Sequence, residues 1–198
     1  EHRHVGRRAT LHAPLSRIRR PLAPPRQLSR ASLTLGLAGA VVADGDDPSL
    51  GTELDGGLGM DLNLGVRLSP YASIHVAWLT AVHDSMPEVD TFERAVLTSF
   101  SFDIRAFLLP NAEAIEPFVQ VGTGLTDMRR DGGPHRDLSG ISFLVGGGVH
   151  VPLNPSIALT AFVLYRPALL EALHTEDGQS ESELLHLFTG SLGMSLRL

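Results

Sequence analysis

The sequence predicts an all-β protein, an eight-stranded antiparallel up-and-down transmembrane β-barrel, and three observations lead to this prediction. Residues 58–68 alternate strictly between large apolar residues and Gly, Asp, Asn or Arg, which is the period of a β-strand. Further alternating segments follow to the end of the chain, and their second faces carry mostly Gly, Ser, Ala and Thr. The acidic residues gather between these segments, at one end of the predicted sheet.

Length and composition narrow the class of protein. A chain of 198 residues suits one domain. It has no Cys, which excludes disulfide frameworks and thiolate metal sites. The longest apolar run, residues 33–43, is shorter than the ~20 residues that a membrane helix needs. A helical membrane protein is therefore excluded, whereas a membrane barrel is not, because alternation hides its hydrophobicity from any average.

Residues 1–30 carry eight Arg, several Pro and no sustained apolar period. We expect an Arg- and Pro-rich disordered tail or the remnant of a leader, with the barrel domain over residues 31–198. A segment that binds nucleic acid or anionic lipid is the functional alternative, and only the positive charge of these residues supports it. We expect no nucleic-acid partner.

Residues 31–43 admit two interpretations. The segment follows Arg30, is apolar and ends in small residues, as the hydrophobic region of a signal peptide does. It also alternates at Leu33, Leu35 and Leu37. Bacterial barrels close with an even number of strands. Seven strands follow from residue 58 onward, so we take residues 31–43 as the eighth.

The seven remaining strands are predicted from alternation and turn residues. Their lengths match the ~9–11 residues that a tilted strand needs to cross a bilayer. Ser69-Pro70 and residues 152–155 are turns, and residues 166–183 are a long loop in which 168–173 could form a helical turn. The predicted strands are residues 58–68, 73–83, 94–108, 117–127, 139–151, 157–165 and 186–198.

The connections and the acidic residues predict the orientation of the barrel. The connections alternate between long and short, as extracellular loops and periplasmic turns do in outer-membrane barrels. Of the 22 acidic residues, 17 fall in the long-loop segments 44–57, 84–93, 127–137 and 171–183. We expect acidic extracellular loops and periplasmic termini.

The apolar faces are predicted to contact lipid. An Arg or Lys facing lipid near the bilayer midplane costs ~2–4 kcal/mol, and the apolar faces carry none there. The small residues of the other faces suit the crowded interior of an eight-stranded barrel. The predicted lipid-facing residues are Leu58, Met60, Leu62, Leu64, Val66, Ile74, Val76, Trp78, Phe100, Phe102, Ile104, Val119, Val121, Phe143, Val145, Leu159, Val163, Leu192, Met194 and Leu196.

Polar residues on the second faces predict a network in the lumen. Buried charges need partners, because an unpaired ion in a medium of low dielectric constant is unfavourable. One interpretation is an ion-pair network that fills and plugs the barrel; the other is an anion-preferring path with Arg67, Arg105 and Arg197 as a basic constriction. The predicted network is Asp61, Asn63, Arg67, His75, Asp103, Arg105, Gln120, His150 and Arg197.

Residues 116–124 and 146–153, followed by 157–165 and the terminal strand, resemble the small outer-membrane β-barrel family of OmpA, OmpX and OmpW type, over residues 31–198. The resemblance implies a monomer in the outer membrane, surrounded by its lipids and lipopolysaccharide. It also implies recognition of the C-terminal strand by the barrel-assembly machinery. The family usually ends in an aromatic residue; here the last residue is Leu198, although the apolar spacing of the strand is kept.

An enzyme is not expected. His83, Asp84 and Ser85 form a loop cluster, and His186 with Ser191 shares one strand; neither set predicts a nucleophile, base and orienting group in one site. Residues 44–47 resemble a fragment of a calcium loop but lack its remaining ligand spacing. We expect no catalytic residue, no metal site and no cofactor.

Three hypotheses for function follow from these observations. The first is an integral outer-membrane barrel with a structural or surface-interaction role and a lumen largely plugged by polar residues. The second is a narrow channel or a carrier for small solutes or apolar molecules. The third, a soluble lipocalin-like ligand binder, would turn the apolar faces inward.

Overall fold

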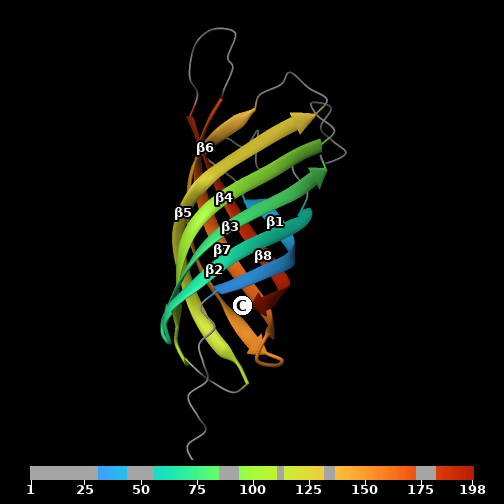
Figure 1. Cartoon of the computed structure of the whole chain (residues 1–198). Helices are drawn as coiled ribbons and strands as arrows, with labels where there is room; N and C mark the ends of the chain where they lie inside the picture. The colour runs from blue at the N-terminus through green and yellow to red at the C-terminus, as the bar shows by residue number, and fades with distance from the viewer. Residues whose placement is uncertain (1–30, 44–55, 85–93, 111–113, 132–136, 173–181) are drawn as a thin grey trace, which may run out of the picture.

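The computed structural model describes residues 31–43, 56–84, 94–110, 114–131, 137–172 and 182–198. These residues form eight β-strands (Figure 1). The strands are β1 (Ala31–Ala43), β2 (Gly57–Ser69), β3 (Ala72–Asp84), β4 (Arg94–Phe107), β5 (Glu116–Asp131), β6 (Leu138–Pro152), β7 (Ile157–Ala172) and β8 (Ser182–Arg197). No helix among these residues is long and apolar enough to cross a membrane.

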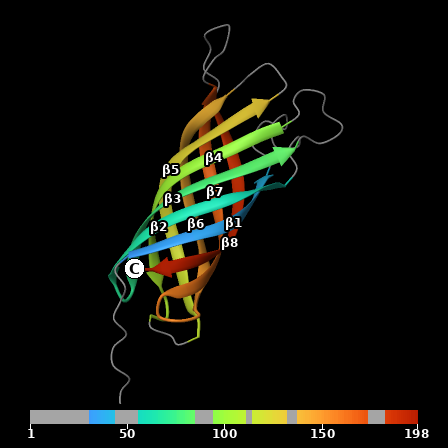
Figure 2. The same ribbon diagram turned by 45° about the vertical axis from the view of Figure 1, so that its right-hand side comes forward.

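The strands form a closed antiparallel barrel in which each strand pairs with its neighbours in the sequence. Closure comes from β1, which pairs with β2 on one side and with β8 on the other. This confirms the predicted fold class and shows that residues 31–43 form a strand. Because the number of strands is even, β1 begins and β8 ends at the same end of the barrel, as two views agree (Figures 1 and 2).

The barrel has two ends, which we call the base and the loop end. The base is the end where β1 begins and β8 ends, and its connections are 70–71, 108–115 and 153–156. The loop end is opposite, and it is where β1, β3, β5 and β7 end. Arg67 bonds to the carbonyl oxygens of Ser69 and Pro70 at the first base turn.

The predicted loop over residues 166–183, with its helical turn at 168–173, is wrong. β7 continues to Ala172, and β8 begins at Ser182, four residues before the predicted start. Pro167 obscured this in the sequence, because Pro has no N–H to donate and argues against a strand interior. The ladder adjusts to it: the pairing of β6 with β7 is interrupted between Ser142–Ala168 and Val145–Tyr165.

The predicted alternation of long and short connections holds only in part. β5 continues to Asp131, so the connection to β6 is only residues 132–137. That is shorter than the base connection 108–115. Asp131, which the sequence predicted in a loop, is the last residue of this strand. Residues 1–30 lie outside the described residues, so the domain boundary at residue 31 stays a prediction.

Candidate functional site

Each strand turns alternate side chains to the wall and to the lumen, because successive residues of a strand point to opposite faces. β4 shows this over its full length: exposed and buried residues alternate through its central part. From the loop end to the base, its inward residues pass from apolar to charged to aromatic. In order they are Ala95, Leu97, Ser99, Ser101, Asp103, Arg105 and Phe107.

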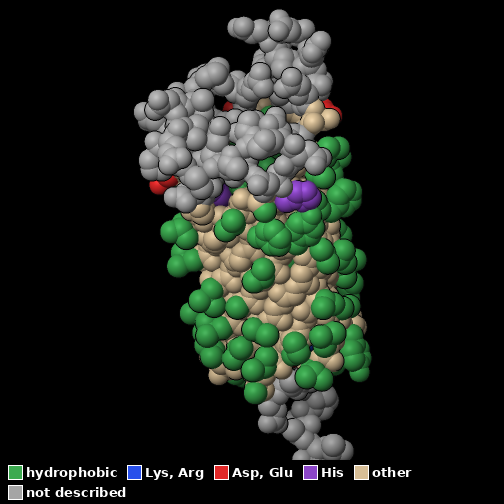
Figure 3. Space-filling view, turned by 180° about the vertical axis from the view of Figure 1, so that it is seen from behind, with side chains coloured by type: hydrophobic (Ala, Val, Ile, Leu, Met, Phe, Trp, Pro, Cys, Tyr) green, Lys and Arg blue, Asp and Glu red, His purple; other side chains and the backbone are tan. Residues whose placement is uncertain are grey.

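The structure places all twenty predicted lipid-facing residues on the outer wall. Nineteen are exposed, and Ile74 is half-buried on the same face. Figure 3 shows apolar side chains distributed over the wall, with acidic and His side chains visible only near the loop end. Among the described outward residues, charged side chains occur only at the loop ends of their strands: Asp84, Arg94, Asp127, Arg129 and Glu171.

At the base of the lumen, one carboxylate lies between two arginines. Glu116 Oε2 accepts hydrogen bonds from Arg67 at 3.2 Å and from Arg197 at 3.4 Å. The guanidinium carbon of Arg67 also lies 3.9 Å from the centroid of the Phe107 ring. The Glu116 side chain is 4% exposed, and those of Arg67 and Arg197 are 13% and 15% exposed. This base cluster (Arg67, Glu116 and Arg197) therefore closes the lumen with polar groups that water reaches.

Two neutral hydrogen-bond chains lie just inside the base cluster. In the first, His75 Nδ1 donates to Asn63 Oδ1 at 2.7 Å, which leaves Nε2 to accept the Ser73 hydroxyl at 2.7 Å. In the second, His150 Nδ1 bonds to the Thr160 hydroxyl at 2.8 Å, which in turn bonds to Ser195. The two predicted lumen histidines thus serve as links between neighbouring strands.

Two carboxylates and two guanidiniums, Asp61, Asp103, Arg105 and Arg166, lie further along the lumen. We call them the charged belt. All four are buried, and Asp103 is 0% exposed. Arg105 Nε lies 3.7 Å from Asp103 Oδ1, an ion pair without hydrogen-bond geometry. Arg166 donates to the Ser99 hydroxyl.

Many polar atoms in and around the charged belt have no hydrogen-bond partner in the structure. They include both carboxylate oxygens of Asp103 and two guanidinium nitrogens of Arg105. Buried polar atoms are nearly always satisfied by protein or ordered water. Further atoms of this kind are Asp61 Oδ1, Asn63 Nδ2, Gln120 Oε1, Arg166 Nε, Thr189 Oγ1 and Ser191 Oγ.

The loop-side part of the lumen is largely apolar, contrary to the predicted polar filling, although the fully buried His83 lies inward there, opposite Ala95. Thirteen buried side chains form one cluster there, which we call the leucine layer. Leu97 and Leu187 are both 0% exposed, on strands that lie opposite each other in the barrel order. The other members are Ala38, Ala40, Val42, Leu79, Ala81, Ala95, Met128, Leu138, Ala168, Leu170 and Leu185. A second cluster, of Phe107, Phe118, Leu144, Phe162 and Leu164, lies on the base side.

Two charged residues of the lumen were not among the predicted site residues. Glu116 was assigned to a connection, although it has the inward parity of Phe118 and Gln120 and would have been found by extending the alternation two residues back. Arg166 was assigned to a loop because Pro167 follows it. It shares the parity of the inward residues Phe162 and Leu164.

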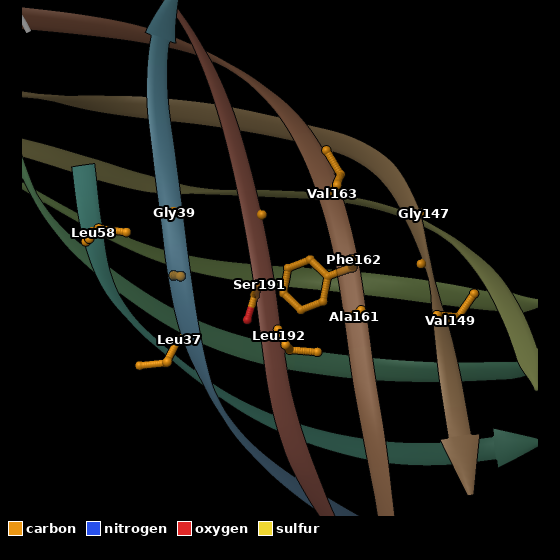
Figure 4. Close-up of a pocket in the computed structure, with 13 residues that line it drawn as sticks. Leu37, Gly39, Leu58, Gly147, Val149, Ala161, Phe162, Val163, Ser191 and Leu192 are labelled. Atoms are coloured by element: carbon orange, nitrogen blue, oxygen red, sulfur yellow. The ribbon is translucent and has the colours of Figure 1, made fainter. Parts of the chain in front are cut away.

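The outer wall carries a shallow apolar groove across β1, β2, β6, β7 and β8, with a volume of about 530 Å³ (Figure 4). Outward Gly39, Gly147 and Gly190 expose strand backbone at its floor. The exposed side chains of Leu37, Leu58, Val149, Val163 and Leu192 line it. A Cβ added at Gly39 or Gly190 would meet nothing closer than 3.7 Å, so packing does not require glycine at either position.

The residues considered for catalysis are not brought together. His186 faces outward, where its Nδ1 is hydrogen-bonded to the Tyr165 hydroxyl at 2.6 Å, whereas Ser191 is an inward residue of the same strand. Ser85 and the calcium-loop fragment 44–47 lie outside the described residues. Among the residues that the structure describes, no group of three or more His, Asp or Glu is placed to hold a metal ion.

No protein-family model and no curated protein matches the sequence. Solved structures do match the fold. Neisserial surface protein A superposes with a TM-score of 0.65 at 16% identity, over 85% of this chain and 97% of that chain. Ail, the attachment invasion locus protein of Yersinia pestis, gives 0.56 at 14% identity, over 86% and 99%.

A third match is the outer membrane protein OprG from Pseudomonas aeruginosa, with a TM-score of 0.58 at 9% identity, over 85% of this chain and 95% of that chain. At these identities the similarity concerns the fold, because one fold serves many functions. It covers 85 to 86% of this chain and 95 to 99% of the three matched chains. The chain therefore has the fold of the small eight-stranded outer-membrane barrels.

Proposed function

We propose that this chain is an integral outer-membrane barrel with a closed lumen and a structural or surface-interaction role, not an enzyme. The apolar outer wall carries this proposal. Exposed large apolar side chains surround the barrel, and a soluble monomer rarely shows contiguous apolar patches larger than a few hundred Å². A lipocalin-like binder would need these faces inside, and they lie outside.

The orientation and the partners belong to this proposal. The termini lie on the periplasmic side, and the acidic loop end faces outward among lipid and lipopolysaccharide. Apolar residues alternate along the outer face of β8 up to Leu196, which supports recognition of this strand by the barrel-assembly machinery. The closed hydrogen-bond ladder leaves no free strand edge, which supports a monomer.

The charge of the loop end indicates which kind of partner it would bind at the cell surface. Ail has been solved in complex with the heparin analogue sucrose octasulfate, which is a polyanion. In this chain 17 of the 22 acidic residues lie in the segments toward the loop end. Like charges repel, so we propose cationic partners or divalent cations for this end rather than polyanions.

The test is refolding of the purified protein into lipid vesicles, followed by extraction with carbonate and then with detergent. The proposal expects release by detergent alone and, in a planar bilayer, stable insertion without ion conductance. A protein that stays soluble without detergent would contradict the membrane location. Conductance steps from the unaltered protein would instead favour the second candidate, a narrow channel, which the charged belt supports.

A further inference from the structure

We propose that the leucine layer is a hydrophobic gate above a hydrated chamber formed around the charged belt. The lumen is then a closed path for small ions and not a solid plug. This inference rests on the proposed membrane location. It goes beyond the proposed function because it states how the barrel is closed and what would open it.

The charged belt requires water. Asp103 Oδ1 and Oδ2, Arg105 Nε and Nη2, and Arg166 Nε are buried without a hydrogen-bond partner. Leaving charged groups in this state is unfavourable by several kcal/mol, whereas an ordered water satisfies two to four such atoms. These atoms come from β4 and β7, and further orphaned atoms come from β2, β5 and β8. They therefore surround one section of the lumen.

The inward glycines of this section pack closely: a Cβ added at Gly36, Gly122 or Gly193 would lie 2.7, 2.4 or 2.5 Å from the nearest atom. Water in this section therefore lies beside the charged side chains and not in space left by the glycines. Across β1, β2 and β8, the register places Gly36 opposite both Asp61 and Gly193. Across β4 and β5, it places Gly122 opposite Asp103. Two carboxylates balance two guanidiniums, so hydration and not an additional counter-ion completes the belt. We call this section of the lumen the chamber.

The leucine layer separates the chamber from the loop end. Its side chains offer no hydrogen bonds, and an apolar constriction closes a path to ions because water does not enter it. Leu97 on β4 and Leu187 on β8 face each other across the lumen, since four strands separate them in either direction. Directly below them on the same strands, Ser99 and Thr189 begin the polar section.

The base is closed in a different way. Arg67 and Arg197 are partly exposed and meet at Glu116, so water has access to this cluster. Charged side chains hydrate when they move apart, whereas leucine side chains do not. This difference assigns the barrier to ions to the leucine layer.

The experiment compares two double variants of nearly equal size in a planar bilayer. L97S/L187S widens the constriction and makes it polar. L97A/L187A widens it by a similar volume and keeps it apolar. An apolar cavity of this kind stays dry. We expect reproducible conductance steps from L97S/L187S and none from L97A/L187A or the unaltered protein. In the conducting variant, adding Asp61→Asn should shift the reversal potential in a salt gradient toward that of anions.

Folding is checked first for each variant, by the shift in gel mobility between unheated and heated samples and by β-sheet circular dichroism. If L97S/L187S does not refold, L97S against L97A and L187S against L187A provide the same comparison. The gate proposal would be wrong if the inserted Ser variants showed no conductance. It would also be wrong if the Ser and Ala variants conducted equally. Either result leaves the proposed function intact, whereas failure of the unaltered protein to insert would contradict the proposed function itself.

Discussion

The two ends of the lumen are closed by opposite kinds of chemistry. At the base, Arg67 and Arg197 share the carboxylate of Glu116 within hydrogen-bond distance. At the loop end, the thirteen apolar side chains of the leucine layer pack together, with His83 as a buried polar neighbour. Because both closures belong to the same eight strands, the difference lies in the choice of inward residues and not in the architecture.

This difference separates two ways of stabilising a crowded barrel interior. Apolar packing tolerates no water and depends on volume, since each missing methylene leaves a cavity. A polar cluster depends on partners, since each removed group leaves another unsatisfied. Substitutions in the two regions should therefore lower the free energy of unfolding for different physical reasons.

The largest expected effect is in the charged belt, between the two closures. Arg105→Met leaves Asp103 without its ion-pair partner at 0% exposure, and removal of one partner from a buried pair costs about 3–5 kcal/mol. The free energy of unfolding is measured in urea with the protein in vesicles. The double variant Arg105→Met/Asp103→Leu should recover most of the loss. A single variant as stable as the unaltered protein would show that the belt is not an ionic unit.

The leucine layer should respond to loss of volume. Leu187→Ala removes a fully buried side chain and should lower the free energy of unfolding by about 2–5 kcal/mol. Leu192→Ala, on the outer face of the same strand, is the matched control, because lipid can fill the space that it leaves. Equal effects from the two variants would contradict the assignment of the two faces.

The base cluster should respond to loss of charge. Glu116→Gln keeps the shape of the side chain and weakens its bonds to Arg67 and Arg197, at a cost of about 1.5–3 kcal/mol. Partial exposure of both arginines makes this loss depend on salt, so 1 M NaCl should reduce the difference from the unaltered protein. The destabilisation by Leu187→Ala should not depend on salt. If salt reduced the destabilisation by both variants equally, the two closures would not differ in chemistry.

The smallest expected effect is in the groove of the outer wall. Gly190→Leu fills open space and should change the free energy of unfolding by less than about 0.5 kcal/mol, as for most surface substitutions. Gly193→Ala on the inner face of the same strand places its Cβ 2.5 Å from the Leu35 carbonyl oxygen and should lower the free energy of unfolding more than Gly190→Leu does. Urea unfolding compares the pair. Similar stabilities would show that the strand is rotated relative to this structure.

The fold was predictable from the sequence because alternation and strand number are local signals. Leu58 to Leu68 specifies a strand without reference to any neighbour, and the even-number rule then required a strand at residues 31–43. The ends of β5, β7 and β8 were not predictable in the same way. The last residues of β5 and β7 and the first residues of β8 lie beyond a Pro or among acidic residues, where a strand and a loop look alike.

The sequence predicted which residues of a recognised strand face the lumen, but it did not predict where the lumen is charged and where it is apolar. Asp61, Asp103 and Arg105 were placed inward correctly in parity, and the structure brings them into one section. Arg166, the fourth member of the charged belt, was assigned to a loop, because Pro167 follows it. The leucine layer was missed because Leu97, Leu185 and Leu187 stand beside outward apolar residues, and a run of apolar residues has no readable period.

The orientation of the outer wall is tested most directly by the fluorescence of the single Trp. Trp78 is 41% exposed on the outer face and lies midway along β3 (Ala72–Asp84). In vesicles of lipids brominated at different depths of the acyl chain, quenching should be strongest for bromines near the bilayer centre. Strong quenching that weakens toward the headgroups is the expected result. Trp78 fluorescence that responds to aqueous iodide and not to brominated lipid would contradict a lipid-facing wall.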